Sequence, residues 1–376
     1  MRKNNFWFAV ATLVGSTVGV GVFGMPLVFA KAGIIPGILF LIGLTVVVVI
    51  VNLLFGEVVL RTQDIHALSG YANKYLDRIS KKVLYFAYIL GIYGALLSYI
   101  IISGVFASNF LPINFNSGQV IWSSLFFIIA AIIVFRGIKT VSRFDFFMLL
   151  FLVVIVATLA SLGIGRIDLS NYILLTREFW FLPFGVTLFA LSGLSAVPLL
   201  RQAIGERGYK VKKAILFGTL IPAVIYLVFT LLVVGISGDI TSPDAISGLS
   251  GFIGDGVVII GSLFGFLAVT TSFVGLGLAL FESFQYDFGF SKIQAWFLAL
   301  LPPYLLFLSG MRNFIDVISL VGGVALSLEG VFVLILYMRA RKKGDRIPEY
   351  SVKLPNLVIY FLILIFVMGF VYTIAN

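Results

Sequence analysis

The stretch VGSTVGVGVFGMP, residues 14–26, places four glycines and one proline inside the first long apolar run of the chain. A glycine in a helix interior costs about 0.5–1 kcal/mol relative to alanine, and an interior proline costs about 3 kcal/mol or more. A continuous helix through this stretch is therefore unfavourable. The stretch predicts a helix that is broken in its middle.

The composition places this broken helix in a membrane. Apolar residues make up 61% of the 376 residues and charged residues 11%, whereas soluble domains average about 45–50% and about 25%. Strand-like alternation over ~10-residue segments is missing from the sequence, which disfavours an outer-membrane barrel. The chain is predicted to be an all-α integral membrane protein.

Apolar runs of about 20 residues, each long enough to cross a ~30 Å hydrocarbon core as a helix, predict eleven transmembrane helices. They lie near residues 7–30, 34–60, 83–110, 118–135, 144–165, 179–200, 214–236, 256–281, 293–309, 314–337 and 354–375.

The basic residues predict the orientation. Of the 26 lysines and arginines, all but Lys31, Arg166, Arg177 and Arg312 lie in segments on the same side as the N-terminus. The positive-inside rule then predicts a multi-pass protein of the cell inner membrane, with a cytoplasmic N-terminus and an extracytoplasmic C-terminus. The net charge of +10 is thereby assigned to topology and not to a nucleic-acid partner.

Reactive side chains are scarce. The chain has no cysteine, which excludes disulfides, thiol catalysis and thiolate metal sites, and its single histidine, His66, falls in a cytoplasmic loop. No loop between the predicted spans exceeds about twenty residues, the length of one membrane span, so the function is expected within the membrane. An enzyme is disfavoured, and no cofactor is expected apart from a coupling ion.

A second break is predicted five spans after the first. The run FWFLPFGVTLFALSGLSAVPLLRQ carries Gly185, Gly193 and Pro198. Five spans per half make the halves start on opposite sides of the membrane, which predicts inverted repeats over residues 1–165 and 179–337, with 354–375 as an extra helix. Paired interrupted segments at corresponding positions are a sequence indicator of a transporter binding site.

The chemistry of a break suits an amino acid. Freed N–H groups at the start of a half-helix attract anions, while freed carbonyls before the break attract an ammonium group or a small cation. Unwound backbone in a membrane is tolerated only where it is buried in protein or lines a cavity. The alternative is close helix packing, because Gly15 and Gly19 stand four residues apart; that alternative leaves the second break unexplained.

Three motifs resemble the bacterial aromatic and hydroxy amino acid permeases. They are VGSTVGVGVFGMPLVFAKAG in span 1, FALSGLSAVPLL in span 6 with KKAILFGTLIPAVIYL behind it, and VTTSFVGLGLALFE in span 8. The wider relatives are the amino acid/auxin permeases and the amino acid-polyamine-organocation superfamily. The resemblance covers nearly the whole chain and implies a LeuT-type fold of five plus five inverted helices with helices 1 and 6 broken.

The resemblance also implies a substrate site between spans 1, 3, 6 and 8. The first break would meet the substrate carboxylate through Ser16, Thr17, Gly19, Val20 and Gly21. The second would offer carbonyls to the amine and a wall to the side chain through Phe189, Ala190, Ser192 and Gly193. Tyr99 in span 3 matches a tyrosine of those permeases; the alternative is an aromatic ring packed on lipid or a neighbouring helix.

A sodium site is one hypothesis for coupling. Ala268, Thr271 and Ser272 lie at i, i+3 and i+4 on one helix face, and the resemblance implies that they join the carbonyls of Gly15 and Val18 around the ion. Oxygen ligands suit a hard cation. The hydroxyls can instead bond to their own helix, and proton-coupled relatives keep similar residues. The span-5 lysine of some proton-coupled relatives has no counterpart in FDFFMLLFLVVIVATLASL.

Two acidic residues within spans are candidates for proton coupling. Glu57 precedes Arg61 by four residues, so a local ion pair is its alternative. Glu329 lies deeper in span 10 and has no basic residue four positions away, and its alternative is a fixed structural contact. Neither break contains an acid, which disfavours cationic substrates.

These observations predict a secondary active permease for neutral amino acids, aromatic ones among them. It would be coupled to Na⁺ or H⁺ and would work by alternating access, with spans 1, 2, 6 and 7 moving as a bundle; the resemblance implies this division. A non-transporting amino acid sensor with the same fold is the alternative. No sequence feature specifies the oligomeric state.

Overall fold

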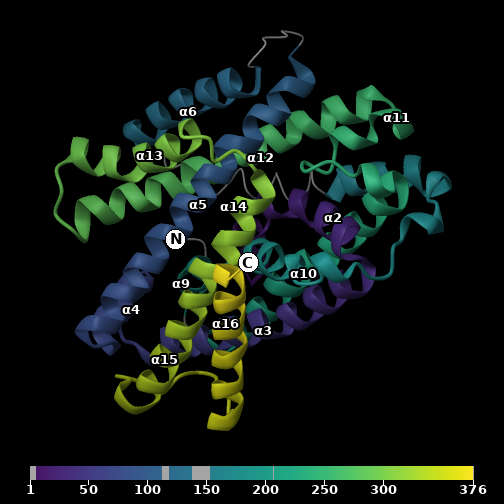
Figure 1. Cartoon of the computed structure of the whole chain (residues 1–376). Helices are drawn as coiled ribbons and strands as arrows, with labels where there is room; N and C mark the ends of the chain where they lie inside the picture. The colour runs from purple at the N-terminus through teal and green to yellow at the C-terminus, as the bar shows by residue number, and fades with distance from the viewer. Residues whose placement is uncertain (1–5, 112–117, 138–152, 206, 376) are drawn as a thin grey trace.

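The computed structural model describes residues 6–111, 118–137, 153–205 and 207–375 (Figure 1). Within these ranges every regular element is a helix, as the apolar runs predict. The first half contains α1 (Phe6–Thr17), α2 (Gly21–Ala32), α3 (Ile34–Arg61), α4 (Leu68–Tyr75), α5 (Arg78–Phe110), α6 (Gly118–Arg136) and the helix Val153–Arg166.

The second half contains one span interrupted by non-helical residues, α8 with α9, and several long helices. Its elements are α8 (Leu182–Ala190), α9 (Val197–Ile204), α10 (Tyr209–Ser237), α11 (Ser250–Ile253), α12 (Asp255–Tyr286), α13 (Lys292–Leu308), α14 (Phe314–Leu320), a π-helical segment (Val321–Leu326), α15 (Ser327–Lys343) and α16 (Asn356–Ala375). The 3₁₀ turns are Ile164–Arg166, Leu169–Asn171, Arg177–Phe179, Leu194–Ala196, Gly238–Ile240 and Ser247–Leu249.

The described residues hold eight helices that are long and apolar enough to cross a membrane, or nine when α1 and α2 count as one broken span. The two other predicted spans are represented by shorter apolar helices, Val153–Arg166 and Lys292–Leu308. The start of the span predicted near 144–165 lies outside the described residues. The predicted number of eleven is thus not confirmed, although each predicted run coincides with an apolar helix where the structure describes it.

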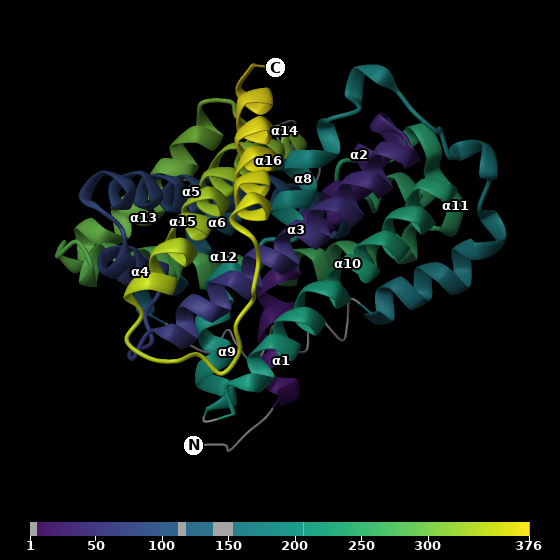
Figure 2. The same ribbon diagram turned by 90° about the horizontal axis from the view of Figure 1, so that it is seen from below.

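The long helices divide into two packed groups. One group contains α1, α2, α3, α8, α9 and α10, and the other contains α5, α6, α12 and α13. In Figure 2, α5, α6 and α13 lie to the left of α16, while α2 and α10 lie to its right. The π-helical segment packs on both α8 and α5, so span 10 joins the two groups.

Backbone atoms make the contact between α8 and span 10. A Cβ placed on Gly322 would lie 1.8 Å from the carbonyl oxygen of Gly185, and one placed on Gly185 would lie 2.2 Å from that of Ser319. Small residues allow this approach, which is how membrane helices gain contact area without a hydrophobic driving force. The π-helical segment begins one residue before Gly322.

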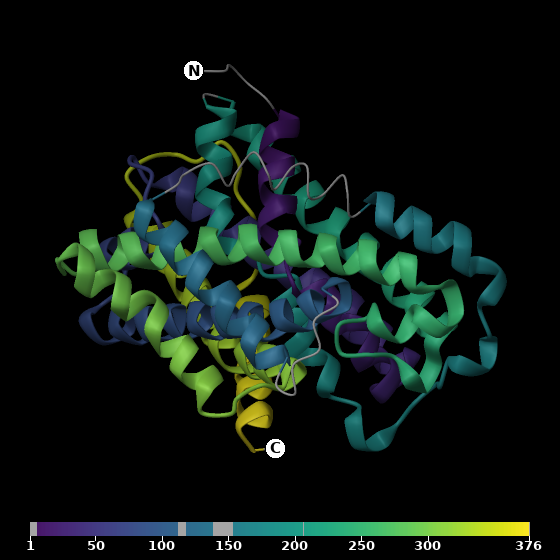
Figure 3. The same ribbon diagram turned by 90° about the horizontal axis from the view of Figure 1, so that it is seen from above.

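The start of α1 and the end of α16 lie at opposite ends of the molecule in Figures 2 and 3. α4 and α9 lie at the same end as the start of α1 (Figure 2). Under the predicted orientation this end is cytoplasmic, and we call it the cytoplasmic end below.

Gly322→Ala is expected to lower the melting temperature of the purified protein, because the added methyl group must displace the backbone of Gly185. The cost should reach or exceed the roughly 1–3 kcal/mol typical of overpacked cores. Gly43→Ala is the matched control, since a Cβ at Gly43 would meet nothing within 4 Å. Melting followed by tryptophan fluorescence checks this; equal melting temperatures for the two variants would contradict the proposed contact.

Candidate functional site

The first predicted break is confirmed. α1 ends at Thr17, α2 begins at Gly21, and the two axes differ by 56°. The N–H of Val18 donates to Val14 O at 2.7 Å as the last bond of α1, and Phe23 N donates to Val20 O at 3.1 Å as α2 starts. Pro26 lies inside α2 and not at the break.

The second predicted break is also present. α8 ends at Ala190, a non-helical stretch and the turn Leu194–Ala196 follow, and α9 begins at Val197. Pro198 is at the start of α9, where a proline costs little because the first N–H groups of a helix have no intrahelical partner. Gly185, which the sequence also offered as an interruption, lies within α8.

The two breaks lie against each other. A Cβ on Gly21 would be 2.6 Å from Cα of Ala190, and a Cβ on Gly193 would be 2.3 Å from Thr17 Oγ1. A glycine in each break therefore allows the two broken segments to approach each other closely. At Gly19 the nearest contact is a side chain, so the close approach between the breaks is made at Gly21 and Gly193.

Tyr99 reaches the first break from α5. It is buried, and its hydroxyl lies 3.5 Å from the position that a Cβ on Gly19 would take. This is ordinary van der Waals contact, so Gly19 faces a polar side chain and not a neighbouring backbone. Phe189 and Ala190, at the end of α8, are also buried. The structure thus gathers residues of three predicted site segments, spans 1, 3 and 6.

The two sides of the first break differ in exposure. Every residue from 20 to 29 is buried, and Phe23 packs edge-to-face on Phe106 of α5 with ring centroids 4.9 Å apart. Towards the cytoplasmic end, Ser16 is exposed, and Ser192 in the second break is half-buried. The region around the breaks is closed by aromatic rings on the α2 side and is less covered on the α1 side.

Tyr226 of α10 is a site residue that the sequence analysis missed. It is completely buried, and its hydroxyl oxygen lies 3.0 Å from Thr17 O and 3.1 Å from Ala190 O. These are the terminal carbonyls of α1 and α8, so one side chain contacts both breaks. A hydroxyl at the middle of the apolar run LIPAVIYLVF was the available signal.

The candidate sodium ligands on α12 are half-buried. The Thr271 hydroxyl donates to Ala268 O at 2.9 Å, which is the intrahelical bond that the sequence left open as an alternative. The hydroxyl oxygen keeps its lone pairs in that arrangement, so the bond does not remove it as a ligand. α12 packs on α5, α6 and α13. The sodium site with Gly15, Val18 and Ser272 stays a prediction.

Glu57 forms the ion pair that its spacing suggested. Its side chain is 0% exposed and lies 2.7 Å from the guanidinium of Arg61. It also accepts hydrogen bonds from the Ser351 hydroxyl at 3.0 Å and the Val352 N–H at 2.5 Å. These contacts give the carboxylate a structural role between α3 and the loop after α15.

Glu329 lies in a different setting from Glu57. It is buried in the first turn of α15, directly after the π-helical segment. π-Helical turns occur frequently at functional sites. Unlike Glu57, Glu329 has no ion pair among the described residues. It therefore remains the candidate for proton coupling.

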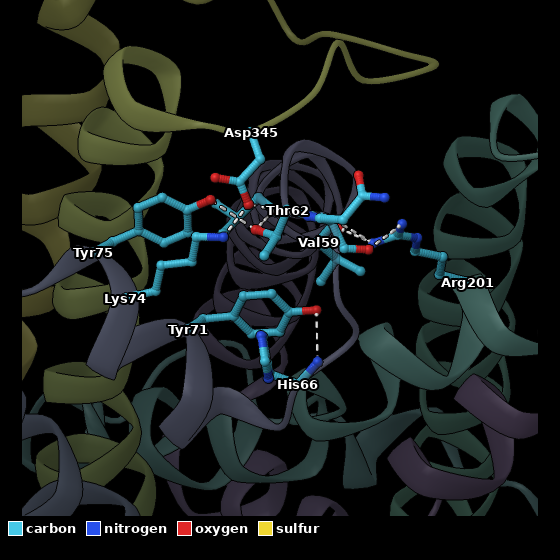
Figure 4. A network of polar contacts seen from close by, with 10 residues as sticks. Val59, Thr62, His66, Tyr71, Lys74, Tyr75, Arg201 and Asp345 are labelled. Atoms are coloured by element: carbon cyan, nitrogen blue, oxygen red, sulfur yellow. Dashed lines mark hydrogen bonds and ion pairs between the residues drawn. The ribbon is translucent and has the colours of Figure 1, made fainter.

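A polar network lies at the cytoplasmic end, around the end of α3 (Figure 4). Arg201 of α9 donates to the carbonyls of Val59 at 2.7 Å, Thr62 at 2.6 Å and Gln63 at 3.0 Å, which satisfies the end of α3. The Lys74 ammonium pairs with Asp345, and this bond lowers the pKa of the Asp345 carboxyl and raises that of Lys74.

His66 belongs to this network through its backbone. Its N–H donates to the Tyr71 hydroxyl at 3.2 Å, and the two rings are edge-to-face. Among the described residues, no three His, Asp or Glu side chains gather closely enough to hold a metal ion.

Residues 344–352, the cytoplasmic strap, cross the end of α3. Asp345 N donates to Arg61 O at 2.9 Å, and the Tyr350 hydroxyl donates to Leu53 O at 2.8 Å. With Glu57 bound to Ser351 and Val352, the cytoplasmic strap ties span 2 to span 10.

Glu57→Gln is expected to loosen the cytoplasmic strap and lower the melting temperature, because Arg61 loses its buried partner. Removing one member of a buried pair typically costs about 3–5 kcal/mol. Glu349→Gln is the matched control: its pair with Arg346 is more exposed, and such pairs contribute about 0–1 kcal/mol. Thermal melting of both variants is the measurement, and a shift no larger for Glu57→Gln than for Glu349→Gln would contradict the structural role.

The sequence and the fold resemble those of known proteins. A family model described as the tryptophan/tyrosine permease family matches residues 2–373. Tyrosine-specific transport system 2 of Haemophilus influenzae is 25% identical over 392 residues, with 97% of this chain and 95% of that protein covered. Tyrosine-specific transport system 1 of the same organism is 24% identical, with 96% and 94% covered.

A solved structure matches the whole chain. The crystal structure of MhsT in complex with L-phenylalanine aligns with a TM-score of 0.65 and 14% sequence identity, covering 100% of this chain and 99% of MhsT. At this identity the likeness establishes the fold. The fold is LeuT-type, as the sequence predicted.

Proposed function

Because the chain belongs to the tryptophan/tyrosine permease family, and is thus an amino acid transporter and not an enzyme, we propose that it takes up neutral amino acids with aromatic side chains by alternating access. The observation that carries this proposal is the contact between the two broken helices. Their unwound ends face each other beside Tyr99, at the junction of spans 1, 3 and 6.

The two breaks offer opposite polarities to one ligand. α2 begins at Gly21 with N–H groups that have no intrahelical acceptor, and α1 and α8 end with carbonyls of Thr17 and Ala190 that have no intrahelical donor. The α2 start suits the substrate carboxylate, and the two carbonyls suit its ammonium group. The first break would thus meet the carboxylate and the second the ammonium group, as the resemblance implies. The carbonyl of Thr17 differs, because it would join that of Ala190 at the ammonium group.

The surroundings favour an uncharged side chain. Neither break contains an acid or a base, so a charged side chain would lose its hydration without gaining a partner. Tyr99 and Phe189 border the breaks and supply aromatic surface. The two Haemophilus influenzae relatives are named as tyrosine transporters, and MhsT was crystallised with L-phenylalanine, which agrees with an aromatic substrate.

Alternating access would use the two helix groups. The group that carries both breaks, with α3 and α10, would rock against α5, α6, α12 and α13 around the glycine contact in span 10. The aromatic closure at Phe23 and the exposure of Ser16 indicate an inward-facing state under the predicted orientation in the cell inner membrane. The cytoplasmic strap would open and close with this motion.

Uptake into proteoliposomes tests transport against the alternative of a sensor. The purified protein should accumulate radiolabelled L-tyrosine, L-tryptophan or L-phenylalanine when a sodium or pH gradient is imposed. Binding of these amino acids without any flux, under either gradient, would favour the sensor.

Gly19→Leu is expected to abolish uptake while leaving the protein inserted and folded. A Cβ at Gly19 already contacts the Tyr99 hydroxyl at 3.5 Å, so the rest of a leucine side chain must enter the space beside Tyr99. Gly43→Leu is the matched control, because nothing lies within 4 Å of its Cβ position. Uptake of L-tyrosine measures the effect, and retained affinity in Gly19→Leu would show that this glycine does not face the substrate.

Coupling to sodium is proposed through Thr271 and Ser272 together with the carbonyls of Gly15, Val18 and Ala268. Thr271→Ala combined with Ser272→Ala should remove any sodium stimulation of uptake, since two of the proposed oxygen ligands are lost. Thr270→Ala is the control, because Thr270 bonds to Phe266 O and lies outside the proposed ligand set.

The same experiment distinguishes proton coupling. If uptake by the unaltered protein ignores sodium and follows an imposed pH gradient, the sodium assignment is wrong. Glu329→Gln is then expected to abolish the response to the pH gradient.

A further inference from the structure

Tyr226 supplies a hydrogen-bond donor to two carbonyls that the two breaks leave without an intrahelical partner. Thr17 and Ala190 are the last residues of α1 and α8, and the terminal carbonyls of a helix have no intrahelical donor and carry partial negative charge. Bringing two such carbonyls together in a buried region is unfavourable unless a donor or a cation lies between them. The Tyr226 hydroxyl lies between them, 3.0 Å and 3.1 Å from the two oxygens.

We propose that Tyr226 is a positioning residue for the substrate ammonium group. This rests on the proposed amino acid transport and deepens it. The hydroxyl holds the carbonyls of Thr17 and Ala190 close together as a neutral donor, whose one hydrogen is shared between the two oxygens.

The lone pairs leave room for the substrate. Each carbonyl oxygen has two lone pairs, and one phenolic hydrogen occupies at most one on each oxygen. The ammonium group of an amino acid brings three N–H donors to the lone pairs that remain. The pair of carbonyls can therefore be joined by Tyr226 and still accept the substrate.

The position of Tyr226 in the fold keeps this arrangement through the transport cycle. α10 packs on α1, α2 and α9, within the same helix group as both breaks. The side chain is completely buried. The Tyr226 hydroxyl should therefore move together with both breaks when this helix group rocks.

Tyr226→Phe tests the proposal, because it removes the hydroxyl and keeps the ring. Tyr172→Phe is the matched control: its hydroxyl also donates to a carbonyl, that of Leu231 on the same helix, at 3.0 Å and away from both breaks. The KM for uptake of L-tyrosine should rise about three- to tenfold in Tyr226→Phe, the factor expected for one net hydrogen bond. The maximal rate should be largely retained, and Tyr172→Phe should behave as the unaltered protein.

A second readout reports on the ammonium group itself. 3-(4-Hydroxyphenyl)propanoate is tyrosine without its amine, and it should compete for uptake much less well than L-tyrosine in the unaltered protein. Tyr226→Phe should narrow this difference, because the lost positioning affects only ligands that carry the amine. If Tyr226 had only a structural role, Tyr226→Phe would lower the melting temperature. It would leave unchanged the ratio of the inhibition constants of 3-(4-hydroxyphenyl)propanoate and L-tyrosine.

The possible outcomes distinguish the positioning role of Tyr226 from the proposed transport function. Unchanged KM and an unchanged ratio in Tyr226→Phe, with the unaltered protein active, would overturn the positioning role alone. An unaltered protein that transports none of L-tyrosine, L-tryptophan and L-phenylalanine would overturn the proposed function itself. An increased KM together with a smaller ratio of the two inhibition constants in Tyr226→Phe supports both the positioning role and the proposed function.

Discussion

The structure depends on one contact, the meeting of two unwound helix segments in the middle of the protein. In a membrane, N–H and C=O groups outside a helix must find partners within the protein. Here the carbonyls of Thr17 and Ala190 find a partner in the Tyr226 hydroxyl, and the two breaks lie against each other.

Glycine appears wherever the backbone itself makes the contact. Gly21 and Gly193 allow the breaks to touch, and Gly185 and Gly322 allow α8 to touch span 10. The first pair lies at the proposed site, and the second pair connects the group that carries it to span 10. Aromatic rings cover the α2 side of the breaks, and the cytoplasmic strap ties span 2 to span 10 at the other end.

Sequence reasoning reached the broken helices because glycine and proline act locally. Both breaks, the helical fold and the ion pair of Glu57 with Arg61 followed from spacing along a single run. The site residues on spans 1 and 6 followed from a resemblance, and the structure brings them together with Tyr99. Tyr226 was missed because its role requires two carbonyls that come from elsewhere in the chain.

The sequence by itself determined that the chain is helical, crosses a membrane and interrupts two of its helices, because hydropathy and backbone propensity are properties of short stretches. It also determined the lack of charge at the breaks. Only the tertiary structure decided which glycines touch, that Glu57 is held by the cytoplasmic strap, and that one tyrosine hydroxyl joins the two breaks. Those facts depend on distances between segments remote in sequence, and packing alone fixes such distances.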